Sequence, residues 1–138
     1  LKRGGGVVVG LGPNAAANLD LYNQLLFADG NGILPGKLLG VREAGADQAF
    51  LLAADDDSFR RPPLAAFRSN EARAGLTTVP FRKYVRLDCP PDGPARRVLS
   101  FVTPAAARKP ADDPSVDPPD AAVVEWPRHR GRVVVYAS

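Results

Sequence analysis

The chain has 138 residues, 45% of them hydrophobic and 24% charged, with a formal net charge of +3 at pH 7. These proportions are close to those of an average globular domain and exclude a wholly disordered chain, while the apolar runs are far shorter than the roughly 20 residues that a membrane-spanning helix needs. The single cysteine, Cys89, excludes an internal disulfide framework and a multi-cysteine zinc site. We therefore expect one domain that has no membrane partner.

Two different segments are expected at the start of the chain. Residues 1–6 are expected to form a flexible basic lead, because ordering three consecutive glycines costs much conformational entropy. The valine run at residues 7–9 then predicts a short strand buried on both faces, since uninterrupted β-branched runs are typical of doubly covered strands. Residues 7–138 are expected to form a single β-rich domain.

One main helix is expected over about residues 14–28. Pro13 suits the first turn of a helix, where its missing N–H is not needed. Apolar side chains then recur at helical spacing, at Ala15, Leu19, Tyr22 and Leu26. The helix is expected to end at the glycine-containing turn over residues 29–32.

The remainder of the chain alternates short apolar runs with turn residues, which is typical of antiparallel β structure. The first two expected strands are joined by residues 42–47, a hairpin loop. The fold class is therefore α+β, mainly β, with an antiparallel sandwich or barrel-like sheet. The expected strands cover residues 37–42, 48–53, 76–81, 83–88, 97–103, 121–126 and 131–137.

Two segments do not read as strands. Residues 54–75 contain an acidic triplet and a short helix expected over residues 64–73. Residues 104–120 are rich in proline and aspartate and predict a long, solvated loop or arm that could lie along a neighbouring chain. The candidate partner contacts are the prolines of this segment and two arginines that follow it: Pro104, Pro110, Pro114, Pro118, Pro119, Arg128 and Arg130.

The turn after the first strand matches the pattern G-x-G-x-x-A through Gly10, Gly12 and Ala15. In dinucleotide-binding folds such glycines let the backbone approach a pyrophosphate at a helix N-terminus. Those folds also place an acidic residue about 20 residues further on, whereas Glu43 lies about 30 residues after Gly12. We therefore interpret the glycines as a hinge into a packed helix, and nucleotide binding as an alternative.

Catalytic chemistry has few candidate side chains. One histidine, His129, and one cysteine leave almost no choice of nucleophile and base. The triplet Asp55–Asp57 lacks the alternating ligands and the glycine of a calcium loop, so it is expected to cap a turn at Ser58. We expect no catalytic residues, no metal and no cofactor.

Residues 32–41, GILPGKLLGV, followed by residues 49–58, AFLLAADDDS, resemble a segment of the head decoration (capsid cement) proteins of tailed bacteriophages. In that family a proline-glycine turn introduces a strand that ends in Leu-Gly, and a second strand leads into an Asp-rich loop. The resemblance covers about 27 of the 138 residues. It implies binding at the junctions of capsid subunits, without catalysis or a cofactor, and a location in the virion.

These observations favour a non-enzymatic structural or assembly module, a virus or phage particle component, that is oligomeric and binds other protein chains. One alternative is a nucleotide-binding domain that forms part of a larger enzyme, which would be intracellular. A second alternative is a basic subunit of a nucleoprotein complex. Nucleic-acid binding is not favoured, because the basic residues form short clusters set among acidic ones.

Overall fold

The computed structural model describes residues 3–62, 64–90, 92–106 and 119–138. It is an α+β fold with more residues in strands than in helices. The strands are β1 (Gly6–Gly10), β2 (Leu38–Glu43), β3 (Leu51–Ala53), β4 (Lys83–Leu87), β5 (Arg96–Val102), β6 (Asp120–Arg128) and β7 (Gly131–Tyr136). The α-helices are α1 (Pro13–Ala17), α2 (Leu19–Tyr22), α3 (Asp56–Arg60) and α4 (Asn70–Thr77).

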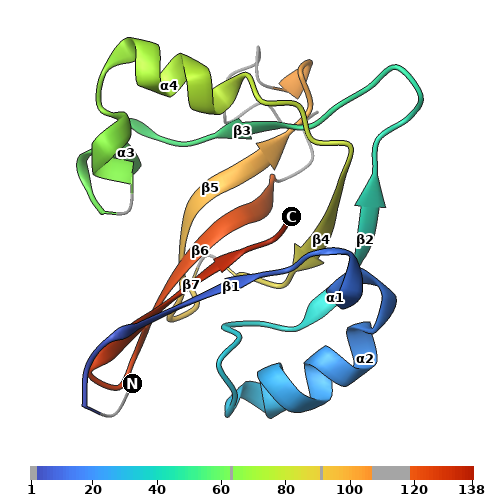
Figure 1. Ribbon diagram of the computed structural model, residues 1–138, viewed down its shortest axis with the longest axis vertical. Helices are drawn as coiled ribbons and strands as arrows, with labels where there is room; N and C mark the ends of the chain where they lie inside the picture. The colour runs from blue at the N-terminus through green and yellow to red at the C-terminus, as the bar shows by residue number, and fades with distance from the viewer. Residues whose placement is uncertain (1–2, 63, 91, 107–118) are drawn as a thin grey trace.

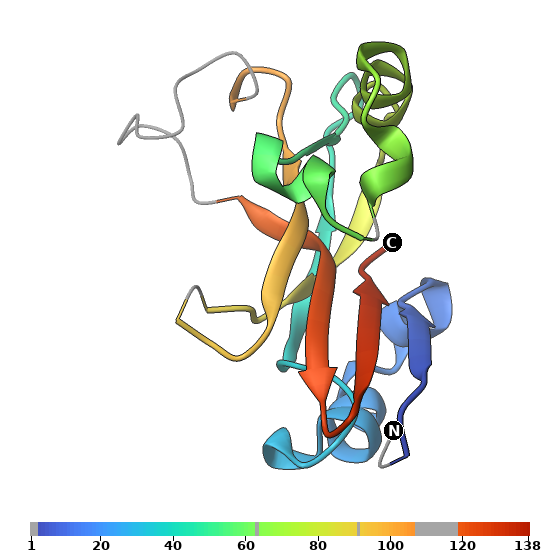
Figure 2. The ribbon, with the colours of Figure 1, turned by 90° about the vertical axis from the view of Figure 1, so that its left-hand side faces the viewer.

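Five strands form one sheet in the order β1-β7-β6-β5-β3, and β2 pairs with β4 in a second, two-stranded sheet. All pairs are antiparallel except β1 with β7, which run parallel. Figure 2 shows β5, β6, β7 and β1 side by side, with β1 outermost. The antiparallel expectation therefore holds for most of the fold, but the sheet is mixed and does not close into a barrel.

Backbone hydrogen bonds join the two sheets near Phe50 and Phe81 and near Val85 and Ala137. Phe50 and Phe81 form an isolated antiparallel bridge, and the backbone N–H of Val85 in β4 donates to the carbonyl of Ala137, just after β7. The core lies where the sheets meet. Alternate residues of the central strands are buried there, including Val124 and Trp126 of β6 and Val133 and Val135 of β7, as the period of two in a strand requires.

The expected helix over residues 14–28 is helical but not continuous. Asn18 interrupts it with non-helical backbone angles, and α2 passes into a π-helical turn, η1 (Asn23–Phe27), and a 3-10 turn, η2 (Ala28–Gly30). The expected apolar face is nevertheless confirmed, because Ala15 is buried and Leu19, Tyr22 and Leu26 pack against the core. The spacing of apolar residues identified the buried face, but it could not reveal the break.

Two strand expectations are wrong. Residues 76–81 are not a strand: α4 extends to Thr77, and only Phe81 makes a β-bridge. The short helix expected over residues 64–73 is instead two elements, η3 (Leu64–Phe67) and α4. The hydroxyl of Ser69 accepts the Ala72 N–H and caps the start of α4. Strands β2 and β3 also do not form a hairpin, because β2 pairs with β4 and β3 with β5.

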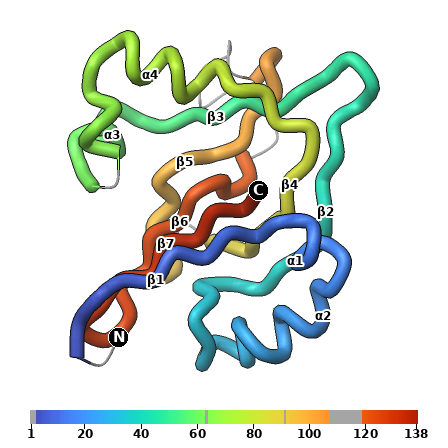
Figure 3. The backbone as a smooth tube through the Cα atoms, in the orientation of Figure 1, coloured from blue at the N-terminus to red at the C-terminus, as the bar shows by residue number. Residues whose placement is uncertain are grey.

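Helical segments separate β1 from β2 and β3 from β4 along the chain, whose course Figure 3 traces. After β1 it turns through α1 and α2 before it returns in β2, and Figure 1 shows α3 and α4 at the opposite end of the molecule from α2. The lead expected at residues 1–6 lies partly outside the described residues, and its last residue, Gly6, belongs to β1. Asp120, expected to end the Pro-rich loop, begins β6.

Candidate interaction site

Strand β1 lies at an open edge of the five-stranded sheet, and β7 is the only described strand that pairs with it. The carbonyl of Gly5 accepts the N–H of Arg132, and the N–H of Leu11 donates to the carbonyl of Tyr136. In a parallel ladder the residues of one strand face its neighbour alternately. Gly5, Val7, Val9 and Leu11 therefore direct their backbone groups to β7, whereas Gly6, Val8 and Gly10 direct theirs away from the sheet.

The side chain of Val8 is also exposed, with 78% of its surface accessible, and that of Val7 is 36% exposed. The prediction that this strand is buried on both faces is therefore wrong. The valine run has the composition of an interior strand, but in the described part of the chain only β7 lies beside it. Unpaired apolar edge strands offer backbone donors and acceptors to another chain, and natural proteins usually guard them with lysine or proline. Strand β1, GVVVG, contains neither.

Other exposed apolar side chains lie close to β1 in the sequence. Of the seven large hydrophobic residues that are exposed in the described part of the chain, six fall between residues 7 and 41, and the seventh is Val79. Besides the two valines of β1 they are Leu21 and Leu25, from α2 and η1, and Leu39 and Val41, from β2. We call these six residues the N-terminal apolar surface.

Two of the elements that carry this surface, η1 and β2, are fixed to each other by Asn23. Its side-chain amide donates to the carbonyl of Leu38 over 2.9 Å and its amide oxygen accepts the N–H of the same residue over 2.7 Å. This two-point contact attaches η1 to the first residue of β2. Figure 1 shows α2 and the start of β2 next to each other, so Leu25 and Leu39 are held at the same end of the molecule.

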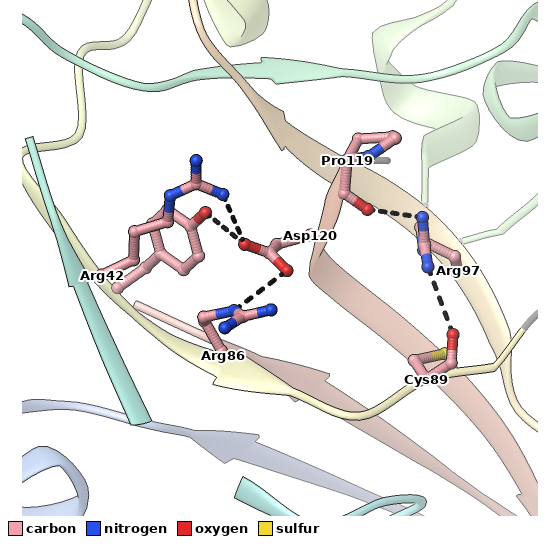
Figure 4. Close-up of polar contacts among 7 residues, drawn as sticks. Arg42, Arg86, Cys89, Arg97, Pro119 and Asp120 are labelled. Carbon is pink, nitrogen blue, oxygen red and sulfur yellow. Dashed lines mark hydrogen bonds and ion pairs between the residues drawn. The ribbon is translucent and has the colours of Figure 1, made fainter. Parts of the chain in front are cut away.

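The end of the Pro-rich segment is anchored to the fold by Arg97. Its guanidinium donates to the carbonyl of Pro119 over 2.6 Å and to the carbonyl of Cys89 over 3.2 Å (Figure 4). Of the candidate partner prolines, Pro104 and Pro119 are exposed, and Pro110, Pro114 and Pro118 lie outside the described residues. Pro104 and Pro119 are therefore both accessible to a partner, and the carbonyl of Pro119 accepts the hydrogen bond from Arg97.

Asp120 forms an ionic cluster, which we call the Asp120 clasp, with three residues of the two-stranded sheet (Figure 4). Its carboxylate accepts from the Tyr84 hydroxyl at 2.6 Å, from Arg42 at 3.2 Å and from Arg86 at 3.3 Å. The Asp120 side chain is only 14% exposed. Burial by itself raises the pKa of Asp120, but the hydrogen bonds from Tyr84 and Arg42 and the charge of Arg86 outweigh it and lower the pKa. The clasp therefore joins β6 to β2 and β4.

Arg128 ends β6, and Arg130 lies in the tight turn between β6 and β7. The Arg128 guanidinium lies 4.8 Å from the centre of the Trp126 ring and donates to the carbonyl of Asn31, so this arginine is committed to contacts within the chain. Arg130 is exposed. His129 occupies the turn in the left-handed region, with φ of 55°, and is exposed. Of the two candidate arginines, Arg130 is the more accessible to a partner.

The three residues of the dinucleotide pattern are brought together by the turn from β1 to α1. Gly12 precedes α1, which has five residues, and its carbonyl accepts the N–H groups of Ala15 and Ala16. Ala15 is 1% exposed and serves the core. After α1 the chain passes through α2, η1 and η2 into β2, which belongs to the second sheet, and Glu43 ion-pairs with Lys83. The residues that would continue a dinucleotide site are thus used elsewhere in the fold.

The remaining candidate groups have structural roles. Asp55 accepts the N–H of Ser58 over 2.6 Å and caps α3, as expected for the acidic triplet. Cys89 is buried, and burial raises the pKa of its thiol. In the part of the chain that the structure describes, no three His, Cys, Asp or Glu side chains are grouped so that they could hold a metal ion, and no helix is long and apolar enough to cross a membrane.

Sequence reasoning did not identify the N-terminal apolar surface or the Asp120 clasp. A signal for the first exists, since Leu21 and Leu25 fall outside the apolar face formed by Leu19, Tyr22 and Leu26 and therefore had no assigned partner. No comparable signal exists for the clasp, because its members come from three strands separated along the chain. Comparisons with known protein families, with characterised proteins and with solved structures found no match to this chain.

Proposed function

We propose that this protein is a non-enzymatic assembly module that binds another protein chain through the N-terminal apolar surface. The observation that carries the proposal is the concentration of exposed large apolar side chains between residues 7 and 41, which hold six of the seven among the described residues. Exposed apolar patches are characteristic of surfaces that a partner covers, and the Asn23 contact brings together the elements that carry Leu25 and Leu39. Leu25 is 64% exposed and Leu39 is 52% exposed. Burying them against a partner would remove apolar surface from water, which favours binding.

The local geometry supports the same proposal. The Asn23 contact holds η1 against β2, so these side chains are presented by a fixed framework. A rigid surface loses less conformational entropy on binding than a mobile one does. Arg130, exposed on the hairpin between β6 and β7, can add a polar contact at the rim of such an interface.

The proposal is tested by placing a photo-crosslinking residue at Leu25, at Leu39 and, as a matched control, at Val79, which is 45% exposed. The full chain is expressed in the cells that naturally make it, and the adducts are identified by mass spectrometry. We expect Leu25 and Leu39 to crosslink to the same protein chain and Val79 not to do so. Equal labelling at all three positions, or none, would contradict the proposal.

The identity of the crosslinked chain tests the finer proposal. Binding at subunit junctions of a virus or phage particle, which the resemblance of residues 32–58 implies, requires the partner to be a particle subunit. This chain must then also sediment with intact particles. A cellular partner would remove that finer proposal and leave the assembly role in place.

Calorimetry distinguishes the nucleotide alternative from the assembly module. An added Cβ at Gly12 meets open space, so Gly12→Val should keep the fold and change only the β1 to α1 turn. Under the proposed function neither form releases heat with ATP or NAD. Binding to the natural chain that disappears in Gly12→Val would favour the alternative. Steeply salt-dependent binding to nucleic acid would favour the nucleoprotein alternative.

A further inference from the structure

We infer that β1 pairs with β1 of a second copy of this chain, in an antiparallel arrangement around a two-fold axis at Val8. The inference rests on the proposed function, because β1 belongs to the N-terminal apolar surface, and it names the partner of that strand. No second described strand pairs with the outward-facing backbone groups of Gly6, Val8 and Gly10, and Val8 is 78% exposed.

The backbone directions of β1 meet the requirement of such a pairing. In an antiparallel ladder, hydrogen-bonded pairs exchange both N–H and C=O groups, and they recur at every second residue. A two-fold axis at Val8 places Val8 opposite Val8 of the second copy, and Gly6 opposite Gly10. All three residues direct their backbone groups outward, so each opposed pair can exchange two hydrogen bonds. An axis at Val7 or Val9 would also oppose outward-facing residues, Gly6 with Val8 or Val8 with Gly10, but it would leave the third outward-facing residue of β1 without an opposed residue from β1.

The side chains of β1 are equally self-complementary. The strand reads GVVVG in both directions, which suits an interface that uses the same patch on both partners. Val8 would contact Val8 of the second copy on one face of the sheet, and the small glycines would meet at both ends. Because β1 contains no charged residue, the two-fold axis brings no like charges together. The two five-stranded sheets would become one continuous sheet.

The size of this contact sets the expected strength of the dimer. A strand of five residues covers less than the roughly 800 Å² that each partner contributes to a standard protein interface. We therefore expect weak, concentration-dependent dimerisation. The end of β1 and the turn that follows it leave room for the second copy, because an added Cβ at Gly10 or Gly12 meets open space.

Sedimentation equilibrium of the full chain across a wide concentration range tests the inference. We expect a monomer and dimer in equilibrium, and we expect Val8→Lys to raise the dissociation constant by about tenfold or more, because it sets two lysines directly opposite each other. Val79→Lys is the matched control, since Val79 is exposed but lies between α4 and β4. It should leave the dissociation constant unchanged, and far-UV circular dichroism checks that both variants fold.

Thiol crosslinking tests the register and does not depend on Val8→Lys folding. On a Cys89→Ala background, Gly6→Cys mixed with Gly10→Cys should give a disulfide-linked dimer, because opposed residues in hydrogen-bonded pairs have Cα atoms about 5.5 Å apart. Gly10→Cys alone should give little dimer. An equal yield from Gly10→Cys alone would overturn the antiparallel register.

A chain that stays monomeric at every concentration, with no disulfide from the mixed variants, overturns the inference. That result is distinguishable from failure of the proposed function, because photo-crosslinking at Leu25 and Leu39 tests η1 and β2 and not β1. Crosslinking at those positions together with a monomeric chain would leave the assembly role in place and remove only the β1 pairing. A foreign strand bound at β1 would likewise overturn the choice of a second copy.

Discussion

Strands β1 and β6 belong to the same sheet and are both rich in valine or alanine, but their surroundings are opposite. Strand β6 has β7 on one side and β5 on the other, and its Ala122, Val124 and Trp126 are each at most 5% exposed. Among the described strands, β1 has β7 as its single neighbour, and Val8 is 78% exposed. The apolar composition of a strand therefore indicates that neighbouring elements should bury it. The strand order decides whether those neighbours belong to the same chain.

The polar groups of β1 and β6 also differ in whether they have partners. Strand β6 begins at Asp120, whose carboxylate is held by Tyr84, Arg42 and Arg86. The outward-facing backbone groups of β1 have no ladder partner among the described strands. Variants that affect β6 should therefore reduce the free energy of unfolding, whereas variants at the exposed face of β1 should change association and leave stability nearly unaltered.

The largest expected effect is that of Trp126→Ala in β6. Trp126 is 5% exposed, lies in the core and contacts the Arg128 guanidinium. Removing a buried aromatic side chain leaves a cavity, so we expect the free energy of unfolding to fall by about 3 to 5 kcal/mol. Urea denaturation followed by circular dichroism measures it. Trp126→Phe, which keeps more of the apolar volume, should cost about 1.5 kcal/mol or less, and equal losses in both variants would argue against a cavity effect.

Asp120→Asn should have the next largest effect. The amide cannot pair with the positive charges of Arg42 and Arg86, and one of its two oxygens is lost as an acceptor. We expect a loss of about 1 to 3 kcal/mol in the free energy of unfolding, the range for leaving buried polar groups without a partner. The control is Asp56→Asn, because the Asp56 side chain is 82% exposed in its ion pair with Arg73 and surface ion pairs contribute little. Similar losses in the two variants would show that the clasp is no stronger than a surface pair.

The pH dependence of stability separates the charge of Asp120 from its shape. Its pKa in the folded protein lies below the ordinary value of 3.8, so the unfolded chain takes up the proton first as pH falls. The stabilisation is thus fully present above the unfolded pKa and is lost as pH falls through the folded pKa. The difference in unfolding free energy between the natural chain and Asp120→Asn should be constant near neutrality and shrink in acid. A difference that grows in acid would contradict this sign.

Asp55→Ala tests a local contact outside both strands. The Asp55 carboxylate accepts the Ser58 N–H at 2.6 Å and caps α3, and loss of such a cap costs about 1 kcal/mol. Thermal denaturation should show a correspondingly small drop in the midpoint. Asp55→Asn, which retains a side-chain acceptor, should recover most of it. An unchanged midpoint in Asp55→Ala would mean that packing alone positions α3.

Val8→Ala should have the smallest effect on stability. Because its side chain is 78% exposed, the free energy of unfolding should change by no more than about 0.5 kcal/mol at dilute concentrations. Val124→Ala is the matched change at a side chain that is 1% exposed, and it should cost about 1.5 kcal/mol or more. Equal effects would remove the contrast between β1 and β6.

The sequence determined the local features of this protein. Pro13 and the spacing of Ala15, Leu19, Tyr22 and Leu26 indicated the helical segment and its buried face, and the acidic triplet indicated a cap. The runs near residues 83–88, 97–103, 121–126 and 131–137 correspond to β4, β5, β6 and β7. These signals succeed because caps and periodicity depend on residues within one or two turns of each other.

Only the tertiary structure decided which strand has a free edge and which charges meet. Asp120 is separated from Arg86, Tyr84 and Arg42 by 34, 36 and 78 residues. Strand β1 has an open edge because it is the last strand in the order of the sheet, next to β7 from the other end of the chain. Such pairings depend on strand order, which local patterns do not encode. The same valine run could have been an interior strand, and the strand order alone made it an exposed edge.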